Sequence, residues 1–470
     1  MKIEQPLIFL PARSWRPSRL QRLGDAMRSS RRAITAIQWA IVAFYLALVT
    51  IPAFLPLPGT GSTVLNNLTL FAQFMFWGIW WPFVIVSVLA MGRVWCGVLC
   101  PEGTLTELAS NHGLGRPVPR WLKWGGWPFV AFVVTTVYGQ LVSVYEYPKA
   151  VLLILGGSTV AAIAIGLVYG RGKRVWCRHL CPVSGVFSLL ARLAPLHFRV
   201  DREKWDAVGH SRTEPVNCAP LIDIRRMTGV SQCHMCGRCS GQRDAVSLAL
   251  RLPGAELVSL KPAEAGAWDA RLLVFGIIGT AAGAFQWSSS SWFVTAKTHA
   301  AEWLIERDSY ALLQDNAPWW LLTHYPEAND VFTWLDGLGV LVYIGVMAAI
   351  LGGWVTLCLR AAGALLPGNA MQNARWLAYS LIPLGGLGVF LGLSSLTVAL
   401  LKAEGATMPW LPEVRGILLA LAALWSLWLG ARLLLAAPGA SAAGRALALA
   451  WLAAATGGVV LPWVLLFYIR

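Results

Sequence analysis

The chain has 470 residues, of which 57% are hydrophobic and only 13% are charged, and its formal net charge is +15. Soluble globular proteins contain roughly 25% charged residues. This composition therefore excludes an ordinary soluble domain and favours a protein that is embedded in a membrane.

Nine apolar stretches of the sequence approach the length of a membrane-spanning helix. About 20 apolar residues in a helix span the hydrocarbon core of a bilayer. The fifth and eighth stretches are short, so nine is an approximate number. The sequence predicts an all-α polytopic membrane protein with about nine transmembrane helices. The stretches are 33–54, 70–91, 127–144, 151–169, 272–287, 338–359, 376–401, 414–430 and 446–468.

The basic residues indicate how these helices are oriented. Of the 38 Lys and Arg residues, 32 fall in the segments 1–32, 92–126, 171–271, 359–376 and 431–445, which all lie on one side of the predicted bilayer. The positive-inside rule makes that side cytoplasmic. We expect a multi-pass protein of a bacterial inner membrane with a cytoplasmic N-terminus. Because the net charge reflects topology, we expect no nucleic-acid partner.

A seven-residue pattern is duplicated at the predicted cytoplasmic surface. Arg-Val-Trp-Cys at 93–96, followed by Leu-Cys-Pro at 99–101, recurs at 174–177 and 180–182. Cys-x3-Cys-Pro is the closing step of the bacterial ferredoxin run, in which Pro follows the last thiolate ligand. Two such units related by pseudo-symmetry would supply the four thiolates of a [4Fe–4S] cluster, and Arg93 and Arg174 would offset its negative charge. Reduced thiols at a helix end and a redox-active dithiol are alternative interpretations. The four cysteines are Cys96, Cys100, Cys177 and Cys181.

A second motif predicts another cluster. Its three cysteines, at Cys-x2-Cys-x2-Cys spacing, are Cys233, Cys236 and Cys239. Three closely spaced thiolates are typical of iron–sulfur proteins, and Gly237 allows a tight turn between them. Arg243 stands where the ferredoxin run has its fourth cysteine. The fourth ligand is then Cys218, which is the simpler choice, or a cysteine of the duplicated pairs.

Zinc is the alternative metal for this second motif. A four-cysteine zinc site tolerates the long spacer between Cys218 and Cys233, although zinc ribbons use two separated cysteine pairs. We interpret His234 as a surface residue that tunes a cluster by hydrogen bonding rather than as a ligand. Disulfides are disfavoured on the cytoplasmic side, and Cys358 is expected to be a small buried apolar residue.

These features divide the chain into four parts. The predicted parts are a basic cytoplasmic tail at 1–32, a four-helix membrane unit with the duplicated motifs at 33–197, a small cytoplasmic ferredoxin-like iron–sulfur segment at 198–268, and a C-terminal membrane half at 269–470 with an external loop at 288–333. The external loop contains six acidic and two basic residues, which suits the docking of a basic or metal-bearing protein.

The duplicated Trp-Cys-x2-Leu-Cys-Pro motifs and the Cys-x2-Cys-x2-Cys segment resemble the NosR/NapH-type family of membrane polyferredoxins, over roughly residues 70 to 251. The resemblance implies electron transfer between quinol or cytoplasmic donors and periplasmic redox partners. The second complete ferredoxin run of that family is absent, and five apolar segments follow. In layout the chain is similar to the FtrD-type polyferredoxin-like subunit of bacterial iron-uptake systems, which implies a periplasmic iron-binding protein, a cupredoxin and a membrane permease subunit as partners.

Two functions follow from the sequence. The first is a membrane-bound electron carrier with one or two [4Fe–4S] clusters, acting between a cytoplasmic or quinone pool and a periplasmic redox partner. The second is a structural or assembly subunit of a membrane transport complex with a four-cysteine zinc site. No histidine lies in an apolar stretch, which disfavours a bis-histidine haem in the bilayer and leaves a bound quinone or flavin, or alternatively a partner subunit, to carry electrons across. We expect an electron carrier or oxidoreductase subunit rather than a stand-alone enzyme.

Overall fold

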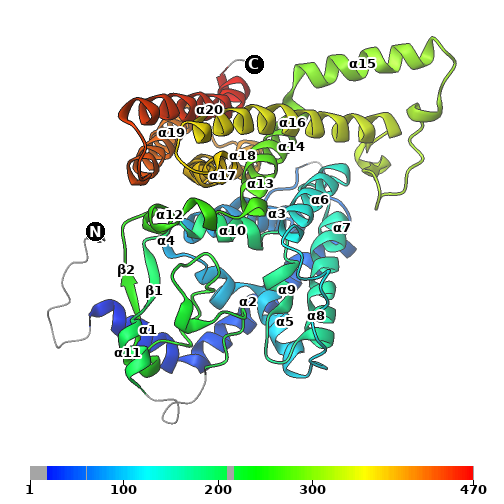
Figure 1. The fold of residues 1–470 in the computed structure, drawn as a ribbon. Helices are drawn as coiled ribbons and strands as arrows, with labels where there is room; N and C mark the ends of the chain where they lie inside the picture. Colours follow the sequence, from blue (N-terminus) through cyan, green and yellow to red (C-terminus); the bar gives the residue numbers. More distant parts are fainter. Residues whose placement is uncertain (1–17, 60, 209–215, 469–470) are drawn as a thin grey trace.

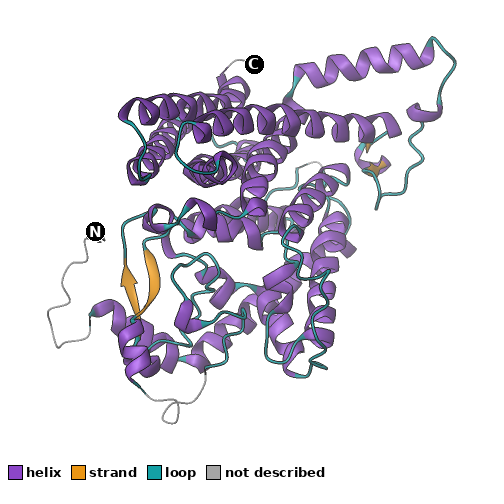
Figure 2. Ribbon diagram, in the orientation of Figure 1, coloured by secondary structure: helices purple, strands orange, loops and turns teal. Residues whose placement is uncertain are grey.

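The computed structural model describes residues 18–59, 61–208 and 216–468, so the first part of the predicted basic tail lies outside the described residues. The described part is mainly helical, as the sequence predicts, and its few strands form two small antiparallel sheets (Figures 1 and 2). The helices are α1 Arg19–Ser29, α2 Arg31–Thr50, α3 Leu68–Gln73, α4 Trp81–Met91, α5 Pro101–Asn111, α6 Trp127–Leu141, α7 Pro148–Val151, α8 Gly157–Tyr169, α9 Val175–His179, α10 Ser184–Ala191, α11 Arg202–Ala207, α12 Ala255–Ser259, α13 Ala267–Arg271, α14 Ala281–Gln286, α15 Ser291–Ile305, α16 Trp334–Ala364, α17 Ala370–Ala378, α18 Ile382–Ala403, α19 Leu411–Ala436 and α20 Ala442–Tyr468.

Within the described residues, eight helical stretches are long and apolar enough to cross a membrane. They are Arg31–Phe54, Leu68–Met91, Pro148–Tyr169, Ala267–Ser289, Trp334–Ala364, Ala370–Ala403, Leu411–Ala436 and Ala442–Tyr468. The predicted span at 127–144 is the short helix α6, whose 15 residues rise about 22 Å, less than the roughly 30 Å of a hydrocarbon core. The two stretches that look short in the sequence are long enough: the helix of the first begins earlier and includes Asp269 and Arg271, and α19 continues past the second through Arg432 to Ala436.

The two copies of the duplicated unit pack reciprocally. In the first copy, a long helical stretch ending in α4 leads through the cysteine motif into α5, and in the second a stretch ending in α8 leads through its motif into α9 and α10. Helix α5 packs against α8, and α10 packs against α4. Each short helix therefore lies on the long helix of the other copy, and this exchange brings the two motifs face to face.

Both long stretches contain a π-helical section, at Phe74–Trp80 in the first copy and at Leu152–Gly156 in the second. A π-helical turn is wider than an α-helical turn and is often found at functional sites. Side chains from both sections line the same internal cavity, which is described below.

The cysteine-rich segment is enclosed by a two-stranded sheet and by α1. Strand β1 (Leu196–Val200) pairs antiparallel with β2 (Val246–Leu250). The cysteine-rich segment between the two strands therefore begins and ends at the same place on the membrane unit. Helix α1 packs on β2, and its Arg28 donates a hydrogen bond to the carbonyl oxygen of Ser240 at 2.9 Å. Residues 19–29 of the predicted tail are thus an ordered cover of the cysteine segment.

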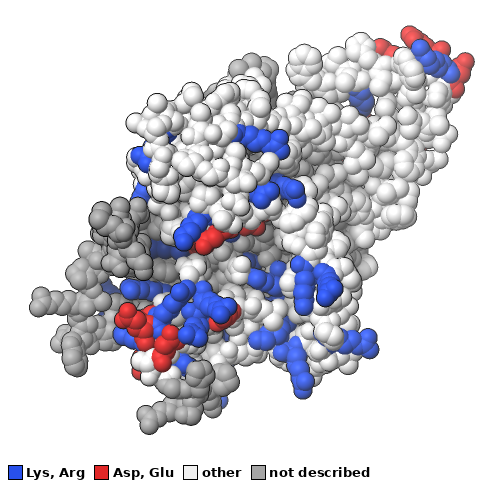
Figure 3. Space-filling model, viewed as in Figure 1, with Lys and Arg blue, Asp and Glu red and all other residues white. Residues whose placement is uncertain are grey.

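The C-terminal half packs α16 to α20 together and carries α15 at its far end (Figure 1). Beyond α15, β3 (His324–Tyr325) pairs with β4 (Asp330–Val331). On the face drawn in Figure 3, most basic side chains lie over the part of the molecule that holds the cysteine motifs, with some acidic side chains among them, and a smaller group of acidic and basic side chains lies at the end of α15.

Candidate iron–sulfur sites

The structure brings the four cysteines of the duplicated motifs together. Cys96 lies in a π-helical turn, Trp95–Leu99, and Cys100 is the N-cap residue of α5, where its sulfur accepts a hydrogen bond from the backbone N–H of Gly103 at 3.3 Å. Cys177 lies in α9 and Cys181 follows it. All four line one cavity. In the first copy the Cys-Pro step is therefore a helix start, for which Pro at the first position is well suited, whereas in the second copy α10 begins two residues after Pro182.

The matching arginines hold the two copies together. Arg174 is 2% exposed and donates a hydrogen bond to the carbonyl oxygen of Cys96 in the other copy. Arg93 is 4% exposed and donates to the hydroxyl of Ser184 at 2.9 Å, and that hydroxyl donates to the carbonyl oxygen of Cys177 at 2.7 Å. Each arginine thus reaches the cysteine backbone of the opposite copy, which is consistent with the pseudo-symmetry.

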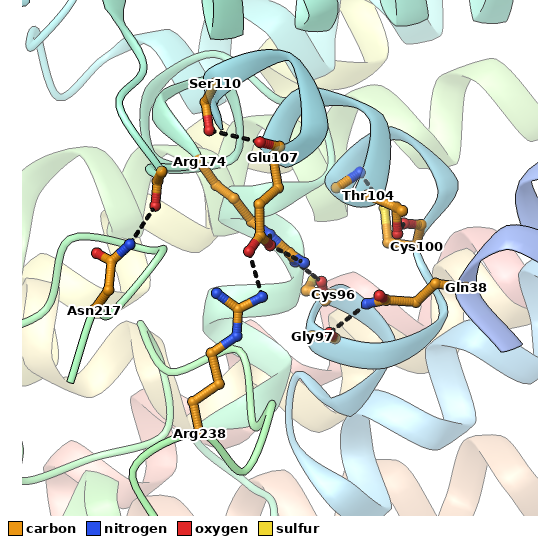
Figure 4. Close-up of polar contacts among 12 residues, drawn as sticks. Gln38, Cys96, Gly97, Cys100, Thr104, Glu107, Ser110, Arg174, Asn217 and Arg238 are labelled. Atoms are coloured by element: carbon orange, nitrogen blue, oxygen red, sulfur yellow. Dashed lines mark hydrogen bonds and ion pairs between the residues drawn. The ribbon is translucent and has the colours of Figure 1, made fainter. Parts of the chain in front are cut away.

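Glu107 in α5 connects these arginines to the second cysteine motif (Figure 4). Its carboxylate accepts a hydrogen bond from Nε of Arg174 at 2.7 Å and forms an ion pair with Arg238, which lies in the Cys-x2-Cys-x2-Cys loop. Nothing in the sequence around Glu107 distinguishes it from a solvent-facing acidic residue, so sequence reasoning missed it. The contact depends on α5, α9 and the loop meeting in three dimensions.

Cys218 lies with the trio rather than with the duplicated pairs. Burial, followed by the charges of Cys239, Cys236 and Cys218, raises the pKa of Cys233. The pKa of Cys239 is raised to about 12, mainly by burial and then by the negative charges of Cys236 and Cys218. The ammonium group of Lys173 donates a hydrogen bond to the backbone carbonyl oxygen of Cys218 at 3.0 Å and so fixes the chain at this cysteine. Electrostatic coupling thus groups Cys218 with the trio, whereas the four cysteines of the duplicated motifs line a cavity together.

The structure tests the sequence-based interpretation of three residues in or near the second motif: Gly237, Arg243 and His234. Gly237 has φ +73°, the left-handed conformation expected of a tight turn. Arg243 points away from the cysteines and donates to the carbonyl oxygens of Trp205 and Val208, at 3.1 Å each. The prediction that His234 lies at the surface is wrong: it is 2% exposed, because α1 and the duplicated unit enclose the loop.

The two thiol sets are in direct contact through their backbones. A Cβ atom added to Gly97, next to Cys96, would lie 2.0 Å from the carbonyl oxygen of His234 and 3.0 Å from Cα of Cys236. The amide of Gln38 in α2 donates to the Gly97 carbonyl oxygen at 3.2 Å and fixes this turn (Figure 4). Only a residue without a side chain allows so close an approach of the two loops.

The donor set suits iron–sulfur ligation. All nine cysteines are free thiols, and burial raises the pKa of Cys177 to about 12, so a thiolate here requires strong positive charge such as bound metal. Residues Cys96, Cys100, Cys177 and Cys181 would hold one cluster, and Cys218, Cys233, Cys236 and Cys239 the other. Among the described residues, no three His, Cys, Asp or Glu side chains converge on a point that a single ion would occupy. Four thiolates around a cubane bind separate iron atoms.

Comparison with known protein families identifies the same two regions. A family model described as a 4Fe-4S binding domain matches residues 73–123 and 153–201, and each match contains one Cys-x3-Cys-Pro motif. In these regions the chain is similar to the NosR/NapH-type membrane polyferredoxins.

Curated relatives match less than half of this chain. It is 26% identical over 239 residues to the putative electron transport protein YccM of Escherichia coli strain K12, which is 44% of this chain and 65% of YccM. It is 28% identical over 186 residues to the ferredoxin-type protein NapH of the same organism, which is 33% of this chain and 62% of NapH. It is 26% identical over 133 residues to the regulatory protein NosR of Pseudomonas aeruginosa, which is 24% of this chain and 19% of NosR. The chain thus spans less than two thirds of each relative. No solved structure matches it.

The cavity beside the first thiol set is large and mainly apolar. Its empty volume is about 1580 Å³, and its walls include Trp77, Trp80 and Phe76 from the first π-helical section. Glu102, one residue after the Cys-Pro step, is the one carboxylate that lines it. Glu102 keeps some accessible surface because it faces this cavity, and it accepts a hydrogen bond from the indole N–H of Trp176 at 3.3 Å.

A second cavity adjoins the first on the side away from the cysteines. Its empty volume is about 940 Å³, and Tyr145, Phe285 and Leu393 line both cavities. Its other walls include Glu146 and Asp330, near the small sheet of the predicted external loop. Three apolar side chains therefore separate a space beside the thiols from a space at the opposite end of the membrane unit.

Proposed function

We propose that this polyferredoxin carries two [4Fe–4S] clusters and transfers electrons between a quinone or flavin bound in the large cavity and a redox partner on the periplasmic side. The observation that carries the proposal is the separation of eight cysteines into two sets of four, with the cavity beside one set. A [4Fe–4S] cluster accepts and donates one electron at a time, and the contact at Gly97 keeps the two sets adjacent.

The arginines of the duplicated motifs have an electrostatic role in this proposal. A cubane with four thiolate ligands carries net negative charge, which is costly to bury without compensation. Arg93 and Arg174 are buried next to the first set, and Arg174 and Arg238 lie between the two sets. Their positive charges stabilise both ligand sets inside the protein.

Apolar walls and a single carboxyl group favour a lipid-soluble carrier that also exchanges protons. Oxidation of a quinol releases two electrons and two protons. Burial raises the pKa of Glu102, although hydrogen bonds from Ser158 and Trp176 oppose this effect. The Glu102 carboxylate is thus suited to take up one of the two protons, and the other passes to water.

We further propose that the partner docks beside α15. Helix α15 and the residues after it form the acidic external loop, where Glu302 and Glu306 lie on α15 and its end. A basic periplasmic redox or iron-binding protein fits this charge. The layout similarity to iron-uptake subunits adds a membrane permease as a neighbour. In this proposal the cysteine motifs lie on the cytoplasmic side of the bacterial inner membrane, as the distribution of basic residues favours.

The first experiment measures iron, acid-labile sulfide and zinc per chain on protein purified without oxygen, together with paramagnetic resonance after reduction with dithionite. About eight iron atoms per chain are expected, as two cubanes require. About four would leave one thiol set without a cluster. Zinc without sulfide would refute the electron-transfer proposal and favour the alternative, a structural subunit with a four-cysteine zinc site.

A second experiment tests the cavity. A short-chain quinol should reduce the clusters of the wild-type protein, and Glu102→Gln should slow this reduction while leaving iron content unchanged. Glu264→Gln serves as a control, because Glu264 lies outside both cavities. Equal quinol reaction rates in all three proteins would argue against the proton-accepting role of Glu102.

A further inference from the structure

A third, polar cavity lies on the cysteine side of the protein and is not needed for the proposed electron transfer. Its empty volume is about 610 Å³. It is bounded by the start of α6, by α10, by α13 and by the loop that carries the second cysteine motif. Its apolar walls include Phe129 and Trp268.

Positive charge predominates in this cavity. Four of its lining residues are basic, namely Arg93, Arg178, Arg192 and His234. The one acidic residue in its wall is Asp269, which pairs with Arg192 at 2.8 Å. The other basic side chains have no carboxylate in this cavity to balance them.

Two of the arginines leave a buried N–H donor without an acceptor among the described residues. The unpartnered donors are Nε of Arg93 and Nε of Arg192. Arg93 is 4% exposed and the Arg192 side chain is 11% exposed, so water does not replace the missing acceptors freely. An unpaired buried donor costs about 1–3 kcal/mol, more if charged, and two around one cavity indicate an absent acceptor.

The placement of the guanidinium groups leads to the same conclusion. Arg93, Arg178 and Arg192 line one cavity, and an anion between them would offset their mutual repulsion. Arg93 also lines the cavity of the first thiol set, where a cluster would balance part of its positive charge. Arg192 lines only the polar cavity.

We propose that this cavity binds the phosphate group of a small ligand. Arginine is the side chain best suited to phosphate, because its planar donors match the phosphate oxygens. The cavity exceeds a phosphate ion in size, and Phe129 and Trp268 offer apolar surface for the rest of the ligand. Two sources have this chemistry: the headgroup of an anionic phospholipid, and a soluble flavin nucleotide.

The test uses the full chain with its metal retained, in detergent and without oxygen. Binding of inorganic phosphate, flavin mononucleotide and dihexanoyl phosphatidylglycerol is measured by calorimetry. We expect saturable binding of one site per chain, competed by inorganic phosphate, with the tighter of the two organic probes identifying the source. Absence of binding for all three probes would overturn the proposal.

Two variants and a control locate the site. Arg192→Gln removes one positive charge and should weaken binding at least tenfold. Ser188→Asp places a carboxylate in the same wall and should have a similar effect, without breaking the Arg192 ion pair. Arg226→Gln, at a side chain that is 84% exposed, should bind as the wild type does. Iron content equal to wild type in each variant verifies folding, and unchanged phosphate affinity in Ser188→Asp would refute the site.

Discussion

Substitution of Glu107 by Gln tests the connection between the two thiol sets. The change keeps the size of the side chain and removes the charge that pairs with Arg174 and Arg238. The Arg174 side chain is 2% exposed and that of Glu107 is 16% exposed, so water cannot replace the lost partner. Leaving a buried charge unpaired costs about 3–5 kcal/mol. Because Gln still accepts a hydrogen bond, we expect a loss near the lower end, about 3 kcal/mol.

An exposed ion pair provides the matched control. Arg225 and Asp206 pair at 3.0 Å with side chains that are 55% and 51% exposed, so Asp206→Asn should cost at most about 1 kcal/mol. Both variants are compared by equilibrium unfolding in mixed micelles, followed by tryptophan fluorescence. A Glu107→Gln effect no larger than that of Asp206→Asn would refute the idea that this carboxylate balances a buried charge.

The same pair predicts a pH dependence. Burial alone would raise the pKa of Glu107, but the charges of Arg174 and Arg238 outweigh it and hold the pKa below its usual range. A carboxyl group whose pKa is lower in the folded state stabilises the protein above its unfolded-state pKa of about 4.3 and loses this effect as the pH falls through the folded-state value. The stability difference between wild type and Glu107→Gln should therefore be constant from about pH 6 to pH 8 and shrink below about pH 4.

Three further predictions concern the cysteine loops. Cys239→Ser should remove about four iron atoms per chain, as measured by iron analysis, whereas Cys358→Ser, at a buried site within α16, should remove none. Arg243→Cys should leave iron content unchanged, because this side chain points away from the other cysteines; a gain of iron would contradict the ligand set. Gly97→Ala should destabilise the protein by about 1–3 kcal/mol in the unfolding assay, since its Cβ would clash with the facing loop, whereas Gly157→Ala, in open space on a helix, should be neutral or stabilising.

The sequence was informative where chemistry depends on local spacing. The Cys-x3-Cys-Pro and Cys-x2-Cys-x2-Cys patterns identify ligands within one turn of chain, and apolar length identifies membrane helices without tertiary information. Helix ends were less predictable: the stretch at 127–144 ends early in α6, the helix of the stretch at 272–287 includes polar residues at its ends, and the helix of the stretch at 414–430 continues past Arg432 to Ala436. Polar residues can continue a helix outside the hydrocarbon core, so hydropathy alone does not set its ends.

By itself, the sequence determined that this is a helical membrane protein with a duplicated cysteine motif and a ferredoxin-like cysteine loop, because these properties follow from composition and short-range periodicity. Only the tertiary structure decided that Cys218 lies with the trio, that His234 is buried, and that Glu107 joins both sets. The cavities also required the structure. Their walls come from helices far apart in sequence, and the reciprocal packing of the two copies, which no local pattern encodes, places those walls side by side.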